Sequence, residues 1–329
     1  MAKSVDSAFQ KFNSNTVNLV SDRTTKARSS RDWLIGQLET LPDKEDDFPV
    51  LYDGKHIKFG SFARNTKIRP LDDIDLIITL NAETSTYHTI TYGKLYYLTP
   101  GDGANKLKKL CDDDGYINSR KVINKLVSSL SKIEQYKSAD VHRKQEAATL
   151  NLTSYEWNFD IVPAFYTDNE HYLIPDGNGH WKASDPRVDQ ERASRINSKH
   201  SGKILQIIRI LKFWNVRATM PTISSYLLEN IILTYFDEQT EISDYIDFNL
   251  VNFWAYLQTG IYSSFLDPKG FQGELNNLSF EDKKKISEKV TDVVKKGKEA
   301  IRLETKEKNQ EKAINKWREI FGDDFPKYG

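Results

Sequence analysis

The segment 60–80, GSFARNTKIRPLDDIDLIITL, constrains the fold more than any other part of the sequence. It ends in a run of β-branched and apolar residues that predicts a buried strand over 74–80. Asp73 and Asp75 stand two residues apart at the head of this strand, so both side chains point to one face. Two carboxylates held so close repel each other unless a cation lies between them. The segment therefore predicts a cation site carried by a strand.

A third carboxylate, Asp160, begins another predicted strand, 158–164. Paired strands lie about 4.8 Å apart, so this side chain can join the first two. Mg²⁺ prefers oxygen ligands, commonly one or two carboxylates together with substrate phosphates. Three carboxylates suit a pair of ions about 3.5–4 Å apart, the arrangement used for in-line phosphoryl transfer. We therefore expect Asp73, Asp75 and Asp160 to be catalytic and to hold two Mg²⁺ or Mn²⁺ ions.

Gly60 and Ser61 follow a short predicted strand, 56–59, and begin a short predicted helix. Glycine lets the backbone approach a phosphate closely, and the first N–H groups of a helix attract anions. Serine adds a hydroxyl that can bind a phosphate oxygen. A lone Gly-Ser or Asp-x-Asp is common in turns and at strand edges. The ordered combination with a third strand-borne aspartate favours a metal-dependent nucleotidyl-transfer site.

The chain divides into a mixed α/β part and a helical part. Sequence periodicity predicts an α+β fold with an N-terminal domain over 1–194 and a helical domain over 195–329. In the first part it predicts a helix over 22–41, loops with short elements over 81–117, a helix capped by Asn118 or Ser119 with Val122, Leu126, Leu130 and Ile133 on its apolar face, strands over 147–152 and 158–164, and a strand–turn–strand over 171–181. In the second it predicts helices over 203–215 and 223–236 and helical structure to the end.

Composition excludes several classes of protein. The single cysteine, Cys111, rules out an internal disulfide framework, and one Cys with six His argues against a zinc finger. Lys+Arg and Asp+Glu are both 47, so a strongly basic nucleic-acid-binding protein is not expected. No apolar run approaches the roughly 18–20 residues that span a bilayer, and residues 1–30 lack the apolar stretch of a signal peptide. We therefore expect a cytoplasmic protein without a membrane partner.

With these motifs in place, the chain resembles the polymerase-β-like nucleotidyltransferase superfamily. Within it, the chain resembles the bacterial cGAS/DncV-like nucleotidyltransferases, which are relatives of cyclic GMP–AMP synthase and oligoadenylate synthase. The resemblance covers most of the chain and implies a mixed-sheet core with flanking helices, packed against a C-terminal helical domain with the active site in the cleft between them. It rests on residues 60–80, FDIVPAF (159–165), ILKFWN (210–215), SSYLLE (224–229) and KWREIFGDDFP (316–326).

The resemblance also implies roles for individual residues. Asp73, Asp75 and Asp160 match the family's metal-binding catalytic carboxylates, and the Gly60–Ser61 turn matches the one that holds the donor triphosphate.

In the helical part, Lys212 matches a phosphate-contacting lysine, Ser225 a serine that touches the triphosphate, and Tyr226 a tyrosine that stacks on a base. A lysine is a point charge suited to phosphate, and base–aromatic stacking contributes about 1–3 kcal/mol. Lys212 could instead be a surface lysine and Tyr226 a core aromatic.

Trp214 is expected to be a core anchor. Second-rank phosphate candidates are Arg64, Lys67, Arg69 and Lys203, and the Trp181 and Asp185–Pro186 segment either lies near the active-site mouth or forms a turn after a hairpin.

The expected activity joins NTPs, including ATP, into a cyclic di- or trinucleotide with release of pyrophosphate. The resemblance implies that this second messenger acts on a separate effector in anti-phage (CBASS-type) signalling. Bacterial relatives are either controlled by regulatory partner proteins or active when expressed alone, and both options stay open for this chain. Direct activation by double-stranded DNA is not expected, because the chain has neither a zinc set nor a basic charge excess. Two alternatives are a nucleotidyltransferase acting on an RNA or protein acceptor, and a non-catalytic nucleotide-sensing protein on the same fold.

Overall fold

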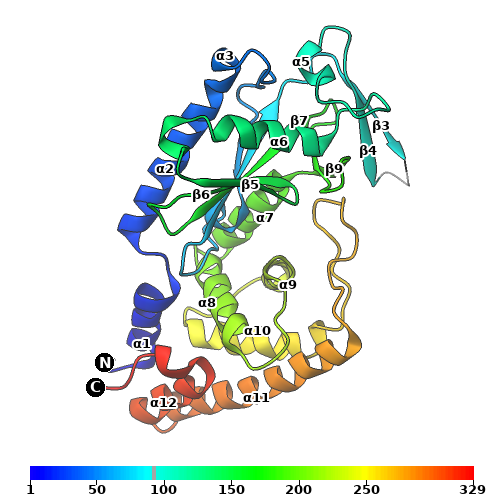
Figure 1. The fold of residues 1–329 in the computed structure, drawn as a ribbon. Helices are drawn as coiled ribbons and strands as arrows, with labels where there is room; N and C mark the ends of the chain where they lie inside the picture. Colours follow the sequence, from blue (N-terminus) through cyan, green and yellow to red (C-terminus); the bar gives the residue numbers. More distant parts are fainter. Residues whose placement is uncertain (91–93) are drawn as a thin grey trace. The chain divides into compact units, whose positions relative to one another are not determined.

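The structure is a computed structural model that describes residues 1–90 and 94–329. Contacts divide the chain into two compact units: residues 21–64 with 71–190 form one, and residues 1–20, 65–70 and 191–329 form the other. We call them the sheet unit and the helical unit (Figure 1). This division differs from the predicted boundary at 194/195, because two N-terminal segments belong to the helical unit.

Aromatic packing and hydrogen bonds explain why these segments join the helices. Helix α1 (Val5–Phe12) buries Phe9, whose ring lies 5.0 Å from that of Trp317 near the C-terminus. The guanidinium of Arg69 donates hydrogen bonds to the backbone carbonyls of Ser14 and Asn18. Neither interaction leaves a local signal in the sequence, so periodicity could not assign these residues to the second unit.

A nine-stranded mixed sheet forms the centre of the sheet unit, as the fold class requires. Its main path runs β1-β2-β7-β8-β9-β4-β3, with β6 on β7 and β5 on β6. The pairing of β2 with β7 is parallel, whereas the other described strand pairs are antiparallel. The strands are β1 (Ile57–Phe59), β2 (Asp73–Leu80), β3 (Thr86–Ile90), β4 (Leu95–Thr99), β5 (Asp140–Lys144), β6 (Ala147–Asn151), β7 (Asn158–Tyr166), β8 (Tyr172–Pro175) and β9 (Trp181–Ser184).

Most predicted elements of this unit are confirmed. Helix α2 (Ser21–Glu39) buries Ala27, Leu34 and Leu38 on one face. Helix α6 (Ser119–Leu130) begins at Asn118, whose side chain accepts two backbone hydrogen bonds, and packs on β5, β6 and β7. Ile133 was expected on this helix but lies beyond its end. Three short helices also belong to this unit: α3 (Leu41–Lys44), α4 (Gly60–Ala63) and α5 (Asn105–Lys108). The longer helix α7 (Pro186–Lys199) begins in the sheet unit and continues past residue 190, where that unit ends.

The prediction of loops with short elements over 81–117 fits the short strands β3 and β4 and the short helix α5, but the pairing of β3 with β4 was not foreseen. Residues 91–93 lie outside the described part. The strand β4 carries three half-buried residues in a row, so it lacks the strict alternation that marks a half-buried strand. Strand β5 and helix α7 were also missed. Both are rich in charged residues, and β5 forms because its backbone pairs with the buried strand β6.

The helical unit packs around a large aromatic core. The rings of Trp214 and Trp254 lie 5.4 Å apart, and both side chains are buried, so the expectation that Trp214 anchors a core is confirmed. Ala2 and Tyr328 form a parallel bridge, which brings the two chain ends together (Figure 1).

None of the helices in residues 1–90 and 94–329 is long and apolar enough to cross a bilayer. The main helices here are α1, α8 (Ile204–Arg217), α9 (Ser225–Glu238), α10 (Ile246–Gly260), α11 (Phe280–Thr305) and α12 (Gln310–Phe321).

A buried carboxylate makes the stability of this unit depend on pH. Asp247 lies in the first turn of α10 and is only 3% exposed. Burial raises its pKa to about 6, and the nearby carboxylate of Glu304 adds to the shift. Between about pH 4 and pH 6 the folded protein keeps a proton that the unfolded chain releases. The free energy of unfolding attributable to this group therefore falls as pH rises through that window.

We predict that Asp247→Asn raises the melting temperature relative to the wild type at pH 8, and that the difference shrinks below pH 4. The amide carries no charge, so it avoids the cost of burying the carboxylate. Thermal unfolding at both pH values measures the effect. Asp244→Asn is the control, because Asp244 is exposed and paired with Lys203. A lower melting temperature for Asp247→Asn at pH 8 would contradict the prediction.

Candidate active site

The register between β2 and β7 places the three predicted catalytic carboxylates on one part of the sheet. Asp75 pairs with Asp160, and Asp73 lies one pleat earlier on the same face. All three side chains are half-buried, whereas Ile74 and Ile161 on the opposite face are buried in the core. The alternation of the strands thus directs the apolar residues inward and leaves the carboxylates on the other face. Their catalytic role stays a prediction.

The Gly60–Ser61 turn lies directly against this carboxylate face. Antiparallel pairing of β1 with β2 sets Phe59 opposite Asp75, and Gly60 follows as the first residue of α4. Gly60 has φ +75°, and a Cβ atom there would lie 1.7 Å from Oδ2 of Asp75. A glycine is therefore required twice, by the backbone conformation and by the space. Ser61 is half-buried in the same turn.

Thr149 is part of this arrangement and was not found from the sequence. It lies on β6 opposite Asp160, is 3% exposed, and its Oγ1 donates a 2.6 Å hydrogen bond to Oδ1 of Asp160. This bond fixes the orientation of the carboxylate. The available signal was the β6–β7 hairpin. Once Asn151 is paired with Asn158, the residues two positions further from the turn on each strand are Thr149 and Asp160, which therefore pair with each other.

The donor set of this face consists of carboxylates, which suit hard ions such as Mg²⁺. Because Gly60 has no Cβ, Oδ2 of Asp75 lies against the backbone of the turn and not against a side chain at position 60. Throughout the described ranges 1–90 and 94–329, no three His, Cys, Asp or Glu side chains are gathered into a ready metal site. Binding of two ions stays a prediction.

Lys212 is not a surface residue. It is 5% exposed, and its Nζ lies 2.6 Å from Oε2 of Glu229, which is 3% exposed. The hydroxyl of Thr66, fully buried, donates a 3.0 Å hydrogen bond to the same carboxylate oxygen. This network joins α8, α9 and the segment 65–70 within the helical unit. A phosphate contact by Lys212 stays a prediction.

The other predicted residues of the helical unit lie at helix ends. Ser225 is the exposed first residue of α9, directly after the cap residue Ser224. Tyr226 is half-buried, and its hydroxyl donates a 2.9 Å hydrogen bond to Asp267. Lys203 precedes α8 and forms an ion pair with the exposed Asp244.

The remaining second-rank candidates lie on either side of the division between the units. Arg64 ends α4 in the sheet unit, where its backbone N–H bonds to the carbonyl of Gly60. Arg69, in the helical unit, directs its guanidinium at backbone carbonyls, which indicates a structural role. Lys67 is half-buried in the same segment.

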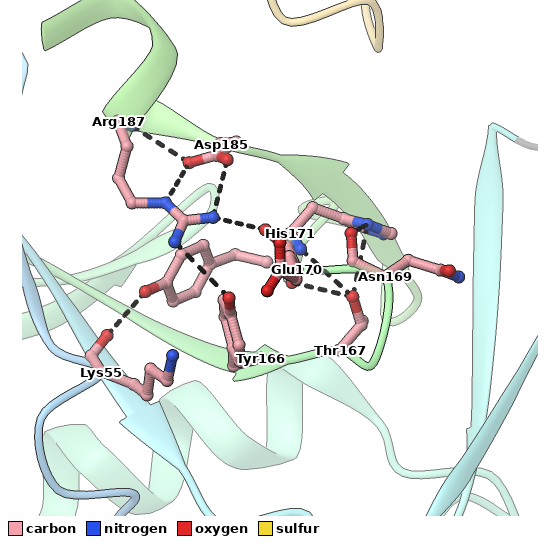
Figure 2. A network of polar contacts seen from close by, with 9 residues as sticks. Lys55, Tyr166, Thr167, Asn169, Glu170, His171, Asp185 and Arg187 are labelled. Carbon is pink, nitrogen blue, oxygen red and sulfur yellow. Dashed lines mark hydrogen bonds and ion pairs between the residues drawn. The ribbon is translucent and has the colours of Figure 1, made fainter. Parts of the chain in front are cut away.

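The Trp181 and Asp185–Pro186 segment forms part of the sheet framework. Trp181 is fully buried and donates a 2.7 Å hydrogen bond to the carbonyl of Ile117. Asp185 accepts hydrogen bonds from Arg187, whose guanidinium lies 5.4 Å from the ring of Tyr166 at the end of β7 (Figure 2). Tyr166 is six residues from Asp160 along this strand, so the network lies well away from the carboxylate face.

Comparisons with known proteins agree with this fold. A family model described as a nucleotidyltransferase domain matches residues 41–146, which include the Gly60–Ser61 turn and β2. A probable cyclic nucleotide synthase of Bacillus cereus (strain VD146) is 48% identical over 100% of this chain and 99% of its own length. A cyclic AMP-AMP-AMP synthase of Acinetobacter sp. (strain ATCC 27244 / 9458) is 22% identical over 82% of this chain and 71% of its own length.

Solved structures show the same fold over nearly the whole chain. CdnC of E. coli MS115-1, solved with ATP, gives a TM-score of 0.71 at 16% identity and covers 98% of both chains. The apo form of Vibrio cholerae DncV gives 0.68 at 12% identity, covering 98% of this chain and 96% of its own.

The mixed sheet, the family model and the full-length relative together define a nucleotidyltransferase. Within that class, the chain belongs to the cGAS/DncV-like nucleotidyltransferases. The alternative of a non-catalytic protein on this fold is therefore set aside.

We predict that Gly60→Ala lowers the rate of pyrophosphate release by about 100-fold, because the added methyl group must displace the Asp75 carboxylate. Gly54→Ala is a matched control: its φ is +73°, but its Cβ would meet nothing within 4 Å. Both variants carry the backbone strain of about 1–2 kcal/mol, which thermal unfolding measures. Equal activity of the two variants would contradict the close contact.

We also predict that Glu229→Leu lowers the free energy of unfolding by about 3–5 kcal/mol, because it removes the carboxylate partner of a buried ammonium. The double variant Lys212→Met with Glu229→Leu should regain most of this loss, since apolar pairs of similar size often replace buried ion pairs without cost. Urea denaturation of the three proteins measures the coupling. A double variant no more stable than Glu229→Leu would show that Lys212 does not depend on this carboxylate.

Proposed function

We propose that the protein joins nucleoside triphosphates into a cyclic di- or trinucleotide at the carboxylate face of β2 and β7. The observation that carries the proposal is the register that sets Asp75 beside Asp160, with the Gly60 turn against Asp75. The full-length relative is a probable cyclic nucleotide synthase, and a more distant one makes a cyclic trinucleotide by its name.

Each residue of the face has a distinct task in this proposal. The Gly60 backbone and the Ser61 hydroxyl bind the phosphates of the donor nucleotide. Asp160, oriented by Thr149, positions and deprotonates the ribose hydroxyl of the acceptor nucleotide. That oxygen attacks the donor α-phosphorus, and pyrophosphate leaves in line. The protein thus contributes mainly by positioning the two nucleotides.

The carboxylates of Asp73, Asp75 and Asp160 would hold two Mg²⁺ or Mn²⁺ ions. When bound, these ions would lower the pKa of the attacking hydroxyl and neutralise the charge of the leaving pyrophosphate. Two divalent ions would also remove the repulsion between the three carboxylates, which otherwise opposes their approach.

The product is proposed to be a second messenger that activates a separate effector in anti-phage (CBASS-type) defence. Support comes from membership of the family, and substrates including ATP fit the ATP complex of the structurally similar CdnC. CdnC also forms a complex with a HORMA protein, which supports control of this chain by a partner protein.

We predict that the purified protein, given Mg²⁺ and mixed NTPs, yields a phosphatase-resistant nucleotide, and that Asp73→Ala with Asp75→Ala abolishes it. Mass spectrometry of the products from each single NTP and each pair measures the activity and identifies the bases. A charge-matched control is Asp113→Ala with Asp114→Ala, which removes two exposed carboxylates from a surface turn. Full activity in the Asp73/Asp75 double variant would refute the assignment.

The same assay separates the alternative acceptor. Label from α-³²P-ATP that appears on RNA or protein, without a small cyclic product, would favour a nucleotidyltransferase with a macromolecular acceptor. The even charge balance gives this alternative no particular support.

A further inference from the structure

The segment between α10 and α11 carries a buried ion pair that the proposed activity does not explain. Asp267 and Lys269 lie on this segment, and their side chains are 0% and 5% exposed. The Nζ of Lys269 lies 2.9 Å from Oδ1 of Asp267. Buried charges are costly to desolvate, so a pair of this kind in a surface connection calls for a specific reason.

The turn around Asp267 engages both of its oxygens, with Oδ1 accepting a long 3.4 Å hydrogen bond from the backbone N–H of Lys269. Oδ2 accepts backbone hydrogen bonds from Phe271 at 3.2 Å and Gln272 at 3.0 Å, which close the turn. Oδ1 also accepts the hydroxyl of Tyr226 at 2.9 Å together with the ammonium of Lys269. One carboxylate therefore links the turn to the first residues of α9.

Lys269 contacts Tyr226 in two ways. Its Nζ donates to the Tyr226 hydroxyl and also lies 4.2 Å from the centre of the tyrosine ring. The ammonium therefore covers one face of the ring, as in a cation–π contact. The hydroxyl is fixed at the same time by Asp267, so the ring has little freedom to tilt or rotate.

The electrostatics of Asp267 agree with this arrangement. Burial alone raises the pKa of Asp267, but hydrogen bonds and charge from Lys269, the N–H of Gln272 and the hydroxyl of Tyr226 outweigh it and hold the pKa below its usual value. The carboxylate thus stays ionised at neutral pH.

We propose that Asp267 and Lys269 are positioning residues for nucleotide binding, which hold the ring of Tyr226 by its hydroxyl and cover one of its faces. The inference rests on the proposed function and on the base-stacking role that the family resemblance implies for Tyr226. A ring held in advance loses less conformational entropy when the nucleotide binds.

The test separates the ring of Tyr226 from its hydroxyl. Tyr226→Ala removes the stacking surface and should weaken binding of a non-hydrolysable ATP analogue by about 10- to 100-fold. Tyr226→Phe keeps the ring and loses only the hydroxyl, and should weaken binding by about 3- to 10-fold. Lys269→Met keeps the length of the side chain without its charge and should weaken binding by a similar factor. Isothermal titration calorimetry measures the dissociation constants.

Steady-state kinetics and thermal unfolding distinguish positioning from a merely structural role. Tyr226→Phe should raise KM for ATP more than it lowers kcat, with a melting temperature close to that of the wild type. Tyr235→Phe is the matched control, since Tyr235 lies on the same helix and its ring packs against Phe236, Phe253 and Tyr256. It should bind the analogue as the wild type does.

The possible outcomes are distinct. If Tyr226→Ala weakens binding while Tyr226→Phe and Lys269→Met bind normally, the ring acts without its support and the inference is overturned. If Tyr226→Ala also binds normally, Tyr226 does not stack on a base. That outcome overturns the inference but leaves untouched the carboxylate face, which the Asp73/Asp75 variants test separately.

Discussion

The parallel pairing of β2 with β7 is the interaction on which the catalytic arrangement depends. Two strands that lie far apart in the sequence meet in a register that sets Asp75 beside Asp160. The pairing extends over eight positions, and the apolar residues of both strands bury their other face in the core. If either strand shifted by one residue, its aspartates would turn toward the core and its apolar residues away from it. Burial of the apolar residues therefore fixes the position of the carboxylates.

In the helical unit, two buried ion pairs position helix α9 much as the strand register positions the carboxylates in the sheet unit. Both Lys212–Glu229 and Lys269–Asp267 contact helix α9, one through Glu229 and the other through Tyr226. A pair of apolar residues could give similar stability, but apolar contacts are not directional and would not select particular partner groups. Hydrogen bonds that engage Thr66 on one side and the tyrosine hydroxyl on the other give α9 one defined set of neighbours.

The sequence predicts the fold and the site best where the signal is local. The Gly60–Ser61 turn and the Asp73–Asp75 strand lie within one short segment, and their order predicted both the elements and the chemistry. Thr149 and Asp267 were missed because their importance comes from pairing with residues elsewhere in the chain. Lys212 shows a different limit: helical periodicity placed it correctly on α8 but did not reveal the acidic partner that allows a lysine to be buried. The β3–β4 hairpin was missed because its residues do not alternate in burial.

The short segment 65–70 has a consequence for how the chain is organised. The backbone leaves the sheet unit after Arg64, belongs to the helical unit for six residues, and re-enters the sheet unit at Leu71, immediately before the paired aspartates. The N-terminal twenty residues also belong to the helical unit. The two units are therefore interleaved along the polypeptide, and no single cut separates them. Neither unit is encoded by one uninterrupted stretch of the gene.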